Sequence, residues 1–459
     1  MGIASTEGWD VVFGLHIDEI NKAIASKVRH SVKFSAQEAR AGALEGEMVD
    51  WKVATGGDGK DVFLAVAFRG AQLTVGTFKP LAVAGHARVQ VRLGFFPAAA
   101  ANAGIATHQL RVQQTAAAGL QAASVESVDP PFQDSDQEAV FCYLFGLWLN
   151  KHSSVFDHVF ASVLLDRTAP GGAFQWLQPT AADYSYVDHK ASNGGVLAVL
   201  CMTGGSSPAN LAQQVSADIL PAGCQAGFLI SSRKLLSQLM LPAMPKIFPG
   251  SKAADFMLSP AGDSIKNANP SAGFTVTDAA GKVYQAQLTS LLVSIDAGAL
   301  NLIATTKATV SPGIRSIVTT TNSMGIQLVN RKDGSQTLSF LEKNHKPPAH
   351  SIEHDKAIDD AQGVLLIATI FITAVVTVLT EGAGTGVCLL ILGVLTGAFD
   401  ATVKIIDLVG QNQAPSINDF WLNCTAPIVW GDCEDVHLVS AGLNGSLQIG
   451  GNVIGKSSK

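Results

Sequence analysis

The stretch of residues 361–399 constrains the fold most, because Glu381 is its only Asp, Glu, Lys or Arg. Its first part, residues 361–380, runs for 20 residues without a charge. As a helix, with about 1.5 Å of rise per residue, this part spans about 30 Å, the thickness of a bilayer core. The stretch must therefore be buried, either in a membrane or inside the protein.

Two details favour burial inside the protein. The second apolar part, residues 387–399, has only 13 residues, which is too short for a helix to cross a bilayer again. Both parts also carry polar or small residues at helical spacing. These residues are Thr369, Thr373, Thr377 and Thr380, then Gly393, Gly397, Asp400, Lys404 and Asp407.

We therefore expect an apolar helical hairpin over residues 350–415 that folds against the rest of the protein. A hairpin that inserts into a membrane through residues 361–399, always or conditionally, stays the alternative, since Thr and Gly also mediate helix contacts in membranes. Glu381, in the Gly-rich turn between the two parts, is the residue at which the alternatives are best tested.

The composition narrows the functional classes. Charged residues make up 15% of the chain and apolar residues 47%, whereas an ordinary domain has about 25% charged residues. Such a chain buries a large apolar area or leaves an apolar surface for a ligand. The net charge is −6 and no block of Lys and Arg occurs, so the basic surface that nucleic acid requires is missing.

Localisation and redox state are also indicated. No positively charged segment followed by an apolar core opens the sequence, which predicts a cytoplasmic protein or one released without a cleavable signal peptide. The six cysteines are scattered, unlike a disulfide framework, so we expect them to be reduced. Cys424 and Cys433 flank a Pro-containing stretch and are the two that an oxidant would pair.

A strand followed by an amphipathic helix opens the chain and recurs 215 residues later. Trp9, Val11 and Phe13 alternate as in a strand, and apolar residues then recur at helical spacing up to residue 29. The second copy starts at residue 223 and has Phe228 in place of Phe13. The helix positions that face a core or a ligand are Ile17, Ile20, Ile24 and Val28 in the first copy and Leu235, Leu239 and Met240 in the second.

Alternating segments follow each copy, and Gly-rich turns such as residues 56–59 separate them. The sequence therefore predicts an α+β protein, mainly antiparallel β, with two modules in which a curved sheet wraps a long helix. The modules cover residues 1–215 and 216–349, the hairpin residues 350–415, and C-terminal strands that close the fold residues 416–459. Coincidence between two generic strand–helix starts stays the alternative to a duplication, and residues 141–149 and 155–165 fit strands or a helix pair.

One motif suggests chemistry. His350, Glu353 and His354 match the H-x-x-E-H pattern of zinc peptidases, which requires both His on one helical face and a carboxylate ligand from elsewhere. Two prolines precede the motif, and the glutamates that follow it do not lie in predicted helices. A zinc hydrolase is therefore a remote alternative, and we expect no enzyme and no cofactor.

The opening residues 8–13, the segment from Phe228 to Phe248 and the closing residues 443–451 resemble the family of the clostridial forty-seven-kilodalton protein from botulinum neurotoxin gene clusters. That family belongs to the tubular lipid-binding (TULIP) superfamily, in which a curved antiparallel sheet wraps a long helix beside an apolar groove. The resemblance implies a non-enzymatic lipid or hydrophobic-ligand binder that serves as a toxin accessory or scaffold protein. It implies as partners a lipid or fatty-acid-like ligand and accessory proteins from the same gene cluster, and it leaves a homodimer and membrane contact open. It transfers no site residues, so the seven helix positions above are the candidate ligand-binding residues, and filling the sheets is their alternative role.

Overall fold

The computed structural model of the chain describes residues 3–27, 30–76, 80–98, 106–114, 121–165, 175–189, 194–248, 250–277, 283–296, 298–330, 334–346, 349–355, 417–431 and 433–455. The predicted hairpin at 361–399 with Glu381, and the predicted site residue Val28, lie outside these ranges. Among the described helices, none combines the length and the apolar character that crossing a membrane requires.

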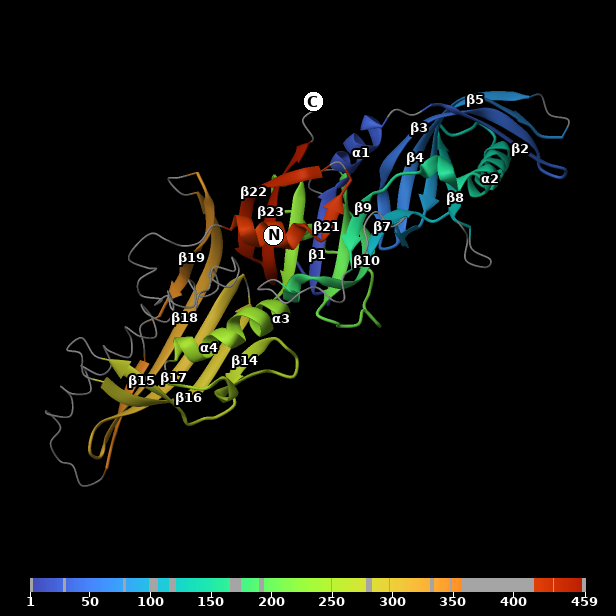
Figure 1. Cartoon of the computed structure of the whole chain (residues 1–459). Coiled ribbons are helices and arrows are strands. Elements are labelled where there is room, and N and C mark those ends of the chain that lie inside the picture. The colour runs from blue at the N-terminus through green and yellow to red at the C-terminus, as the bar shows by residue number, and fades with distance from the viewer. Residues whose placement is uncertain are drawn as a thin grey trace.

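A six-stranded antiparallel sheet forms the middle of the molecule (Figure 1). Its order is β10 (Pro179–His189), β11 (Gly194–Thr203), β1 (Val11–His16), β12 (Ala226–Ser231), β23 (Ser446–Gly455) and β22 (Cys433–Leu443). Every residue of β11, β1 and β12 is buried, as expected for the inner strands of a sheet covered on both faces.

The two copies of the strand–helix start meet in this sheet. β1 and β12 are 215 residues apart at both ends, and they pair antiparallel with Phe13 directly opposite Phe228. The hydrogen bonds beside them are also repeated, because His16 N donates to Gln225 O at 2.8 Å and Ser231 N donates to Asp10 O at 3.0 Å. The equivalence of the two strand–helix starts is therefore confirmed, and a local two-fold axis passes between the two phenylalanines.

A curved five-stranded sheet and a helix form one end of the molecule (Figure 1). The strands are β2 (Val32–Glu38), β3 (Gly42–Asp58), β4 (Asp61–Thr74), β5 (Leu81–Val91) and β8 (Ala123–Asp129). The helix that packs against β2, β3 and β8 is α2 (Ser135–Lys151), which settles the open assignment of residues 141–149. Phe141, Phe145 and Trp148 of α2 lie against Phe34 and Phe68 of the sheet.

The prediction that the opening helix fills this sheet is wrong. That helix, α1 (Ile17–Ser26), ends three residues before the predicted limit and packs against β1, β3 and β11, beside the central sheet. The physical reason is that α2 carries the longer apolar surface, from Val140 to Leu149, and so fills the interior of the curved sheet. A separate small sheet has four strands. They are β6 (Leu93–Pro97), β7 (Thr107–Val112), β9 (Ala161–Leu164) and β21 (Ile428–Trp430).

An eight-stranded sheet forms the other end. Its strands are β13 (Phe256–Leu258), β14 (Ser264–Asn267), β15 (Ala272–Thr277), β16 (Val283–Asp296), β17 (Ala299–Ser311), β18 (Ile314–Asn330), β19 (Gln336–His345) and β20 (Ala349–His354). The second-copy helix crosses this sheet in Figure 1 as α3 (Ser232–Lys234), a π-helical segment η5 (Leu235–Met240) and α4 (Leu241–Ile247), with Pro245 inside α4. The domain boundaries at 215, 349 and 415 remain predictions, although β20 pairs with β18 and so extends this sheet past residue 349.

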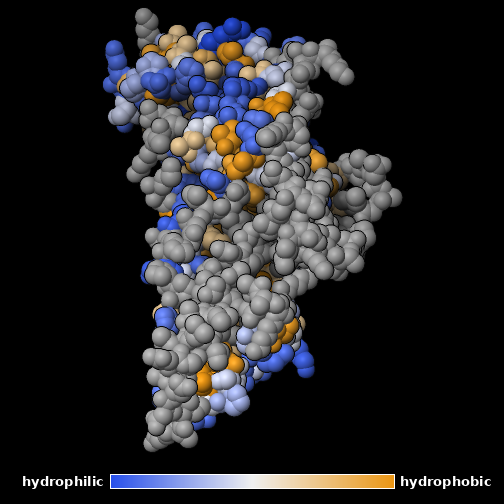
Figure 2. All heavy atoms as spheres, turned by 90° about the vertical axis from the view of Figure 1, so that its left-hand side faces the viewer, coloured by the Kyte–Doolittle hydropathy of each residue, from blue (hydrophilic) through white to orange (hydrophobic). Residues whose placement is uncertain are grey.

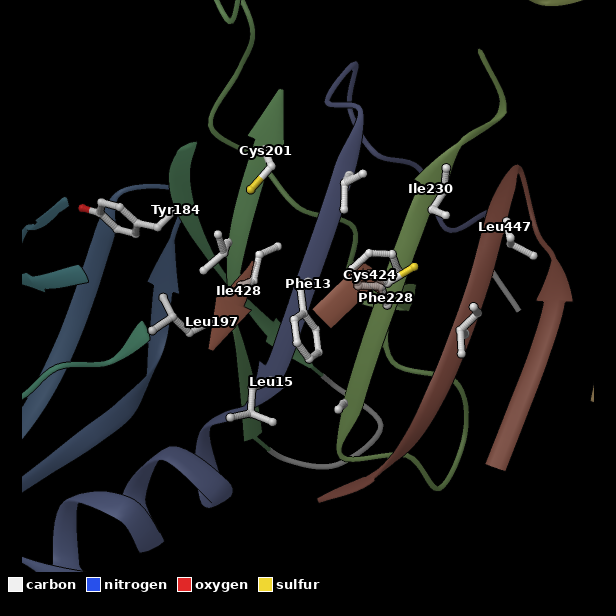
Figure 3. Close-up of a cluster of buried hydrophobic side chains, with 14 of the residues drawn as sticks. Phe13, Leu15, Tyr184, Leu197, Cys201, Phe228, Ile230, Cys424, Ile428 and Leu447 are labelled. Carbon is white, nitrogen blue, oxygen red and sulfur yellow. The ribbon is translucent and has the colours of Figure 1, made fainter. Parts of the chain in front are cut away.

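A short helix, α8 (Asn418–Thr425), and β21 cover one face of the central sheet at the two-fold axis (Figure 3). The Trp421 ring lies 6.1 Å from Phe13 and 5.8 Å from Phe228, edge to face in both cases. The prediction of strands over residues 416–459 is wrong for α8, because the apolar residues there face the core from one side of a helix. The predicted C-terminal strands are confirmed as β22 and β23.

The remaining described elements are short 3-10 helices. A separate observation is that the exposed apolar residues are dispersed over the described surface. The 3-10 helices are η1 (Ser153–Phe156), η2 (Gln175–Leu177), η4 (Ala217–Ile219) and η6 (Ala253–Asp255). On the described surface in Figure 2, hydrophobic residues form small separate groups among hydrophilic ones. Scattered apolar residues of this kind are normal and need no partner.

Candidate ligand-binding site

An apolar pocket of about 450 Å³ lies beside α1. One wall is α1 with the end of β1, and the other walls come from the segment before β9, the end of β21 and strands β22 and β23. Its volume falls in the range of about 300–1,000 Å³ that is usual for small-ligand sites. The residues around it are Leu15, Glu19, Ile20, Lys22, Ala23, Ser26, His158, Phe160, Trp430, Gly431, Cys433, Val453 and Gly455.

Two polar side chains fix α1 beside the pocket. His16 caps the helix, since its Nδ1 accepts a hydrogen bond from Asp18 N at 3.2 Å. Asn21 binds the backbone of β3 twice, because its Nδ2 donates to Val53 O at 3.0 Å and its Oδ1 accepts from Val53 N at 2.8 Å. The Asn21 side-chain amide thus pairs with β3 as the backbone of a neighbouring strand would. It holds α1 at a fixed distance from the five-stranded sheet.

The deep end of the pocket is hydrophobic. Leu15, Ile20, Phe160 and Trp430 are all at most 4% exposed. The Trp430 ring also packs edge to face on Phe13, with centroids 6.1 Å apart, so this wall is continuous with the core of the central sheet. Such a wall offers an alkyl chain dispersion contacts and burial.

The outer end of the pocket carries charge. Lys22 Nζ lies 2.7 Å from Glu19 Oε1, and the two side chains are 68% and 11% exposed. The same Oε1 accepts a hydrogen bond from Gln225 Nε2, also at 2.7 Å. Glu19 is therefore held in place by the second strand–helix start, whereas Lys22 extends into solvent.

Cys433 lies in the same wall, and its thiol is a poor nucleophile because it stays protonated at neutral pH. Burial, together with the negative charge of Asp435 and Glu19, raises the pKa of its thiol to about 11. Cys424, which is fully buried in α8, has a pKa raised well above the ordinary thiol value by burial. Both cysteines are free thiols in the structure.

The second strand–helix start has a pocket at the equivalent place, and that pocket is polar. Its volume is about 760 Å³, and its lining includes Asp10, Ser231, Arg233, Lys234 and Ser237. Lys234 occupies the position that corresponds to Glu19, and its Nζ lies 3.3 Å from Asp10 Oδ2. The two strand–helix starts therefore adjoin one apolar and one polar pocket.

The predicted ligand-binding residues fall into one that lines the apolar pocket and five that lie in the hydrophobic core. Ile20 lines the apolar pocket. Ile17, Ile24, Leu235, Leu239 and Met240 are at most 4% exposed in the hydrophobic core and line neither pocket. Sequence reasoning missed Phe160, Trp430 and Val453, which come from segments without a shared motif, so no local signal pointed to them.

The zinc-peptidase pattern does not form its site. His350, Glu353 and His354 lie on the strand β20, not on a helix, so the glutamate faces the side opposite to both histidines. Glu353 Oε2 instead accepts from Lys307 Nζ at 2.6 Å and lies 3.5 Å from Arg315 Nε, and the bond from Lys307 lowers the pKa of Glu353. The remote zinc-hydrolase alternative lacks the helix that it requires, because the segment pairs with β18 and is therefore extended.

The architecture is that of a known class of antiparallel β proteins. The structure of P47 from Clostridium botulinum A2 superimposes with a TM-score of 0.66 at 15% identity, over 98% of each chain. P47 of Clostridium botulinum E1 gives a TM-score of 0.63 at 15% identity, over 97% of this chain and 99% of that one.

Sequence comparison names the family. Protein OrfX3 of Paraclostridium bifermentans is 27% identical over 495 aligned residues, and OrfX3 of Clostridium botulinum (strain Kyoto / Type A2) is 26% identical over 497, with 98% of both chains covered in each case. The OrfX-like family model, described as Protein OrfX2/OrfX3/P47, matches residues 6–451. The chain belongs to the OrfX-like family, which confirms the resemblance seen in the sequence.

Proposed function

We propose that this protein is a non-enzymatic binder of a lipid or fatty-acid-like ligand and that it serves as an accessory or scaffold protein of a toxin gene cluster. The apolar pocket beside α1 is the observation that carries the proposal. Its polar outer end and hydrophobic deep end suit an amphiphilic molecule. Burial contributes about 0.8 kcal/mol per methylene, so ten buried methylenes supply a gross ~8 kcal/mol before the cost of association.

The proposed setting follows from the family. Accessory proteins encoded in the same gene cluster are the proposed partners, and a homodimer belongs to the same proposal. The proposed location is the cytoplasm, or outside the cell after release without a cleavable signal peptide. Insertion of residues 361–399 into a membrane is the competing proposal, and it does not use the pocket.

A pocket-filling variant tests the proposal. Gly431 lines the pocket, and a Cβ there would lie 3.5 Å from Val159 O and 4.0 Å from Ala23 Cβ, so a larger side chain fits without a backbone clash. We expect delipidated full-length protein to bind the uncharged fluorescent probe Nile red and Gly431→Leu to bind it at least tenfold more weakly. Gly273→Leu is the matched control, because a Cβ at Gly273 meets nothing within 4 Å and that strand lies in the eight-stranded sheet.

Three outcomes separate the alternatives. Equal probe binding by wild type and Gly431→Leu, with unchanged circular dichroism, would overturn the pocket as the binding site. Absence of both probe binding and co-purifying lipid in native mass spectrometry would overturn lipid binding itself. Co-sedimentation with liposomes that is lost in Glu381→Lys but kept in Gly431→Leu would favour membrane insertion.

A further inference from the structure

The head group of the ligand is indicated by Glu19, and this step rests on the proposed function of the pocket. Glu19 is the only carboxylate among the pocket-lining residues of the described chain. Its Oε1 accepts from both Lys22 and Gln225, whereas its Oε2 has no hydrogen bond or ion pair within the described ranges. The Glu19 side chain is 11% exposed, so a carboxylate oxygen without a protein partner lies at the apolar cavity.

The neighbouring charges favour a donor over an acceptor. Lys22 is 68% exposed on a flexible stem, so it leaves the carboxylate at little cost, whereas Gln225 keeps Glu19 in place. Asp435 adds a second negative charge on this side, since its field and that of Glu19 both act on Cys433. A ligand carboxylate at the pocket mouth would meet like charge, whereas a hydroxyl or an ammonium would find an acceptor.

The volume of the pocket matches a ligand whose apolar part is a single chain. A methylene occupies about 30 Å³, close to the share of one water molecule in the liquid. A cavity of about 450 Å³ therefore accommodates roughly 15 methylenes. That is the volume of one long alkyl chain.

We propose that the pocket binds a single-chain amphiphile whose head group donates hydrogen bonds to Glu19, a hydroxyl or an ammonium group, and that it discriminates against chains ending in a carboxylate. The hydroxyl and ammonium forms share this donor chemistry. Glu19 acts as the specificity-determining residue, and Leu15, Ile20 and Trp430 surround the chain.

The test compares three ligands of equal chain length, tetradecanol, tetradecylamine and myristate, in displacement of the uncharged fluorescent probe Nile red from the full-length protein below their aggregation concentrations. We expect the alcohol or the amine to displace the probe at least tenfold better than myristate. In Glu19→Gln the advantage of the amine falls about tenfold, as expected for loss of one charge-assisted hydrogen bond, while myristate binds no worse. Asp18→Asn is the matched control, because Asp18 is 71% exposed on the same helix and lies outside the pocket lining.

The outcomes distinguish this inference from the proposed function. If myristate is the best ligand, or if Glu19→Gln changes all three ligands equally, the donor assignment is overturned while lipid binding stands. If none of the three ligands displaces the probe from wild type, the proposed function fails as well. Lys22→Met gives an independent check, since removing the competing ammonium should strengthen amine binding and not weaken it. Weaker amine binding in Lys22→Met would overturn the assignment even if Glu19→Gln behaves as expected.

Discussion

Breaking the ion pair between Lys234 and Asp10 should destabilise the junction of the two strand–helix starts. Lys234 Nζ lies 3.3 Å from Asp10 Oδ2, and the side chains are 11% and 8% exposed. At an effective dielectric constant of about 20, the attraction over this distance is about 5 kcal/mol. Lys234→Met keeps the length of the side chain but leaves a buried carboxylate unpaired, so we expect a loss of about 3–5 kcal/mol in the free energy of unfolding.

A double-mutant cycle in urea, followed by tryptophan fluorescence, measures this loss. Asp10→Asn removes the charge and still accepts the hydrogen bond that Thr203 N makes to Oδ2 at 2.9 Å. The double variant should therefore be less destabilised than the sum of the single variants, by about 2–3 kcal/mol. Arg111→Met is the control for an exposed pair, since Asp157 there is 66% exposed, and its loss should stay below about 1 kcal/mol. A loss from Lys234→Met as small as that of the control would refute the reasoning.

Three further predictions follow from individual contacts. Gly227→Ala should lower the free energy of unfolding by about 1–3 kcal/mol in urea, because its Cβ would lie 2.1 Å from Ile219 O. Hydrogen bonds from Arg69 and Ser31 lower the pKa of Glu47 from 4.5 to about 2, so its stabilisation is complete above pH 4.5 and is lost as the pH falls towards 2. The difference in urea midpoint between wild type and Glu47→Gln should accordingly be full at pH 6 and smaller at pH 3. Cys424 should resist iodoacetamide at pH 8 in the native state and react in urea, because burial raises its pKa, with mass spectrometry of the peptides as the readout.

Each of these predictions has its own contrary result. Gly273→Ala, at a strand glycine with free space around its Cβ, should be near neutral, and an equal loss at both glycines would remove the steric argument. A Glu47→Gln difference that is constant from pH 6 to pH 3 would show that the carboxyl has no depressed pKa. Rapid native alkylation of Cys424 would mean that α8 leaves the central sheet in solution.

The sequence predicted those parts of the fold that a local periodicity encodes. The strand–helix start and its repeat were visible because apolar residues alternate in β1 and then recur every three to four residues in α1. The helix α2 was left ambiguous, because its residues from Val140 to Leu149 are almost all apolar and so have no clear period. The H-x-x-E-H pattern does not form its site, because a motif specifies spacing alone and backbone pairing with β18 makes the segment extended.

The candidate site was predictable only in part. The α1 side of the pocket follows from helical spacing, which placed Ile20 on the inner face. The opposite wall consists of Phe160, Trp430 and Val453, which reach the pocket through pairings between strands hundreds of residues apart. The role proposed for Glu19 depends on a hydrogen bond from Gln225. This contact could be recognised only from the relative positions of the two strand–helix starts in the structure.

The antiparallel contact of β1 with β12 has the geometry of an isologous dimer, in which a strand pairs with its own copy across a two-fold axis. Here both copies belong to one polypeptide, so each half is free to change without changing the other. A symmetric dimer would have to place the same residue at both helix starts, whereas this chain places a carboxylate at one, Glu19, and an ammonium at the other, Lys234. The presence of both strand–helix starts in one chain thus permits two chemically opposite pockets about a single axis, at a fixed distance and in a ratio of one to one.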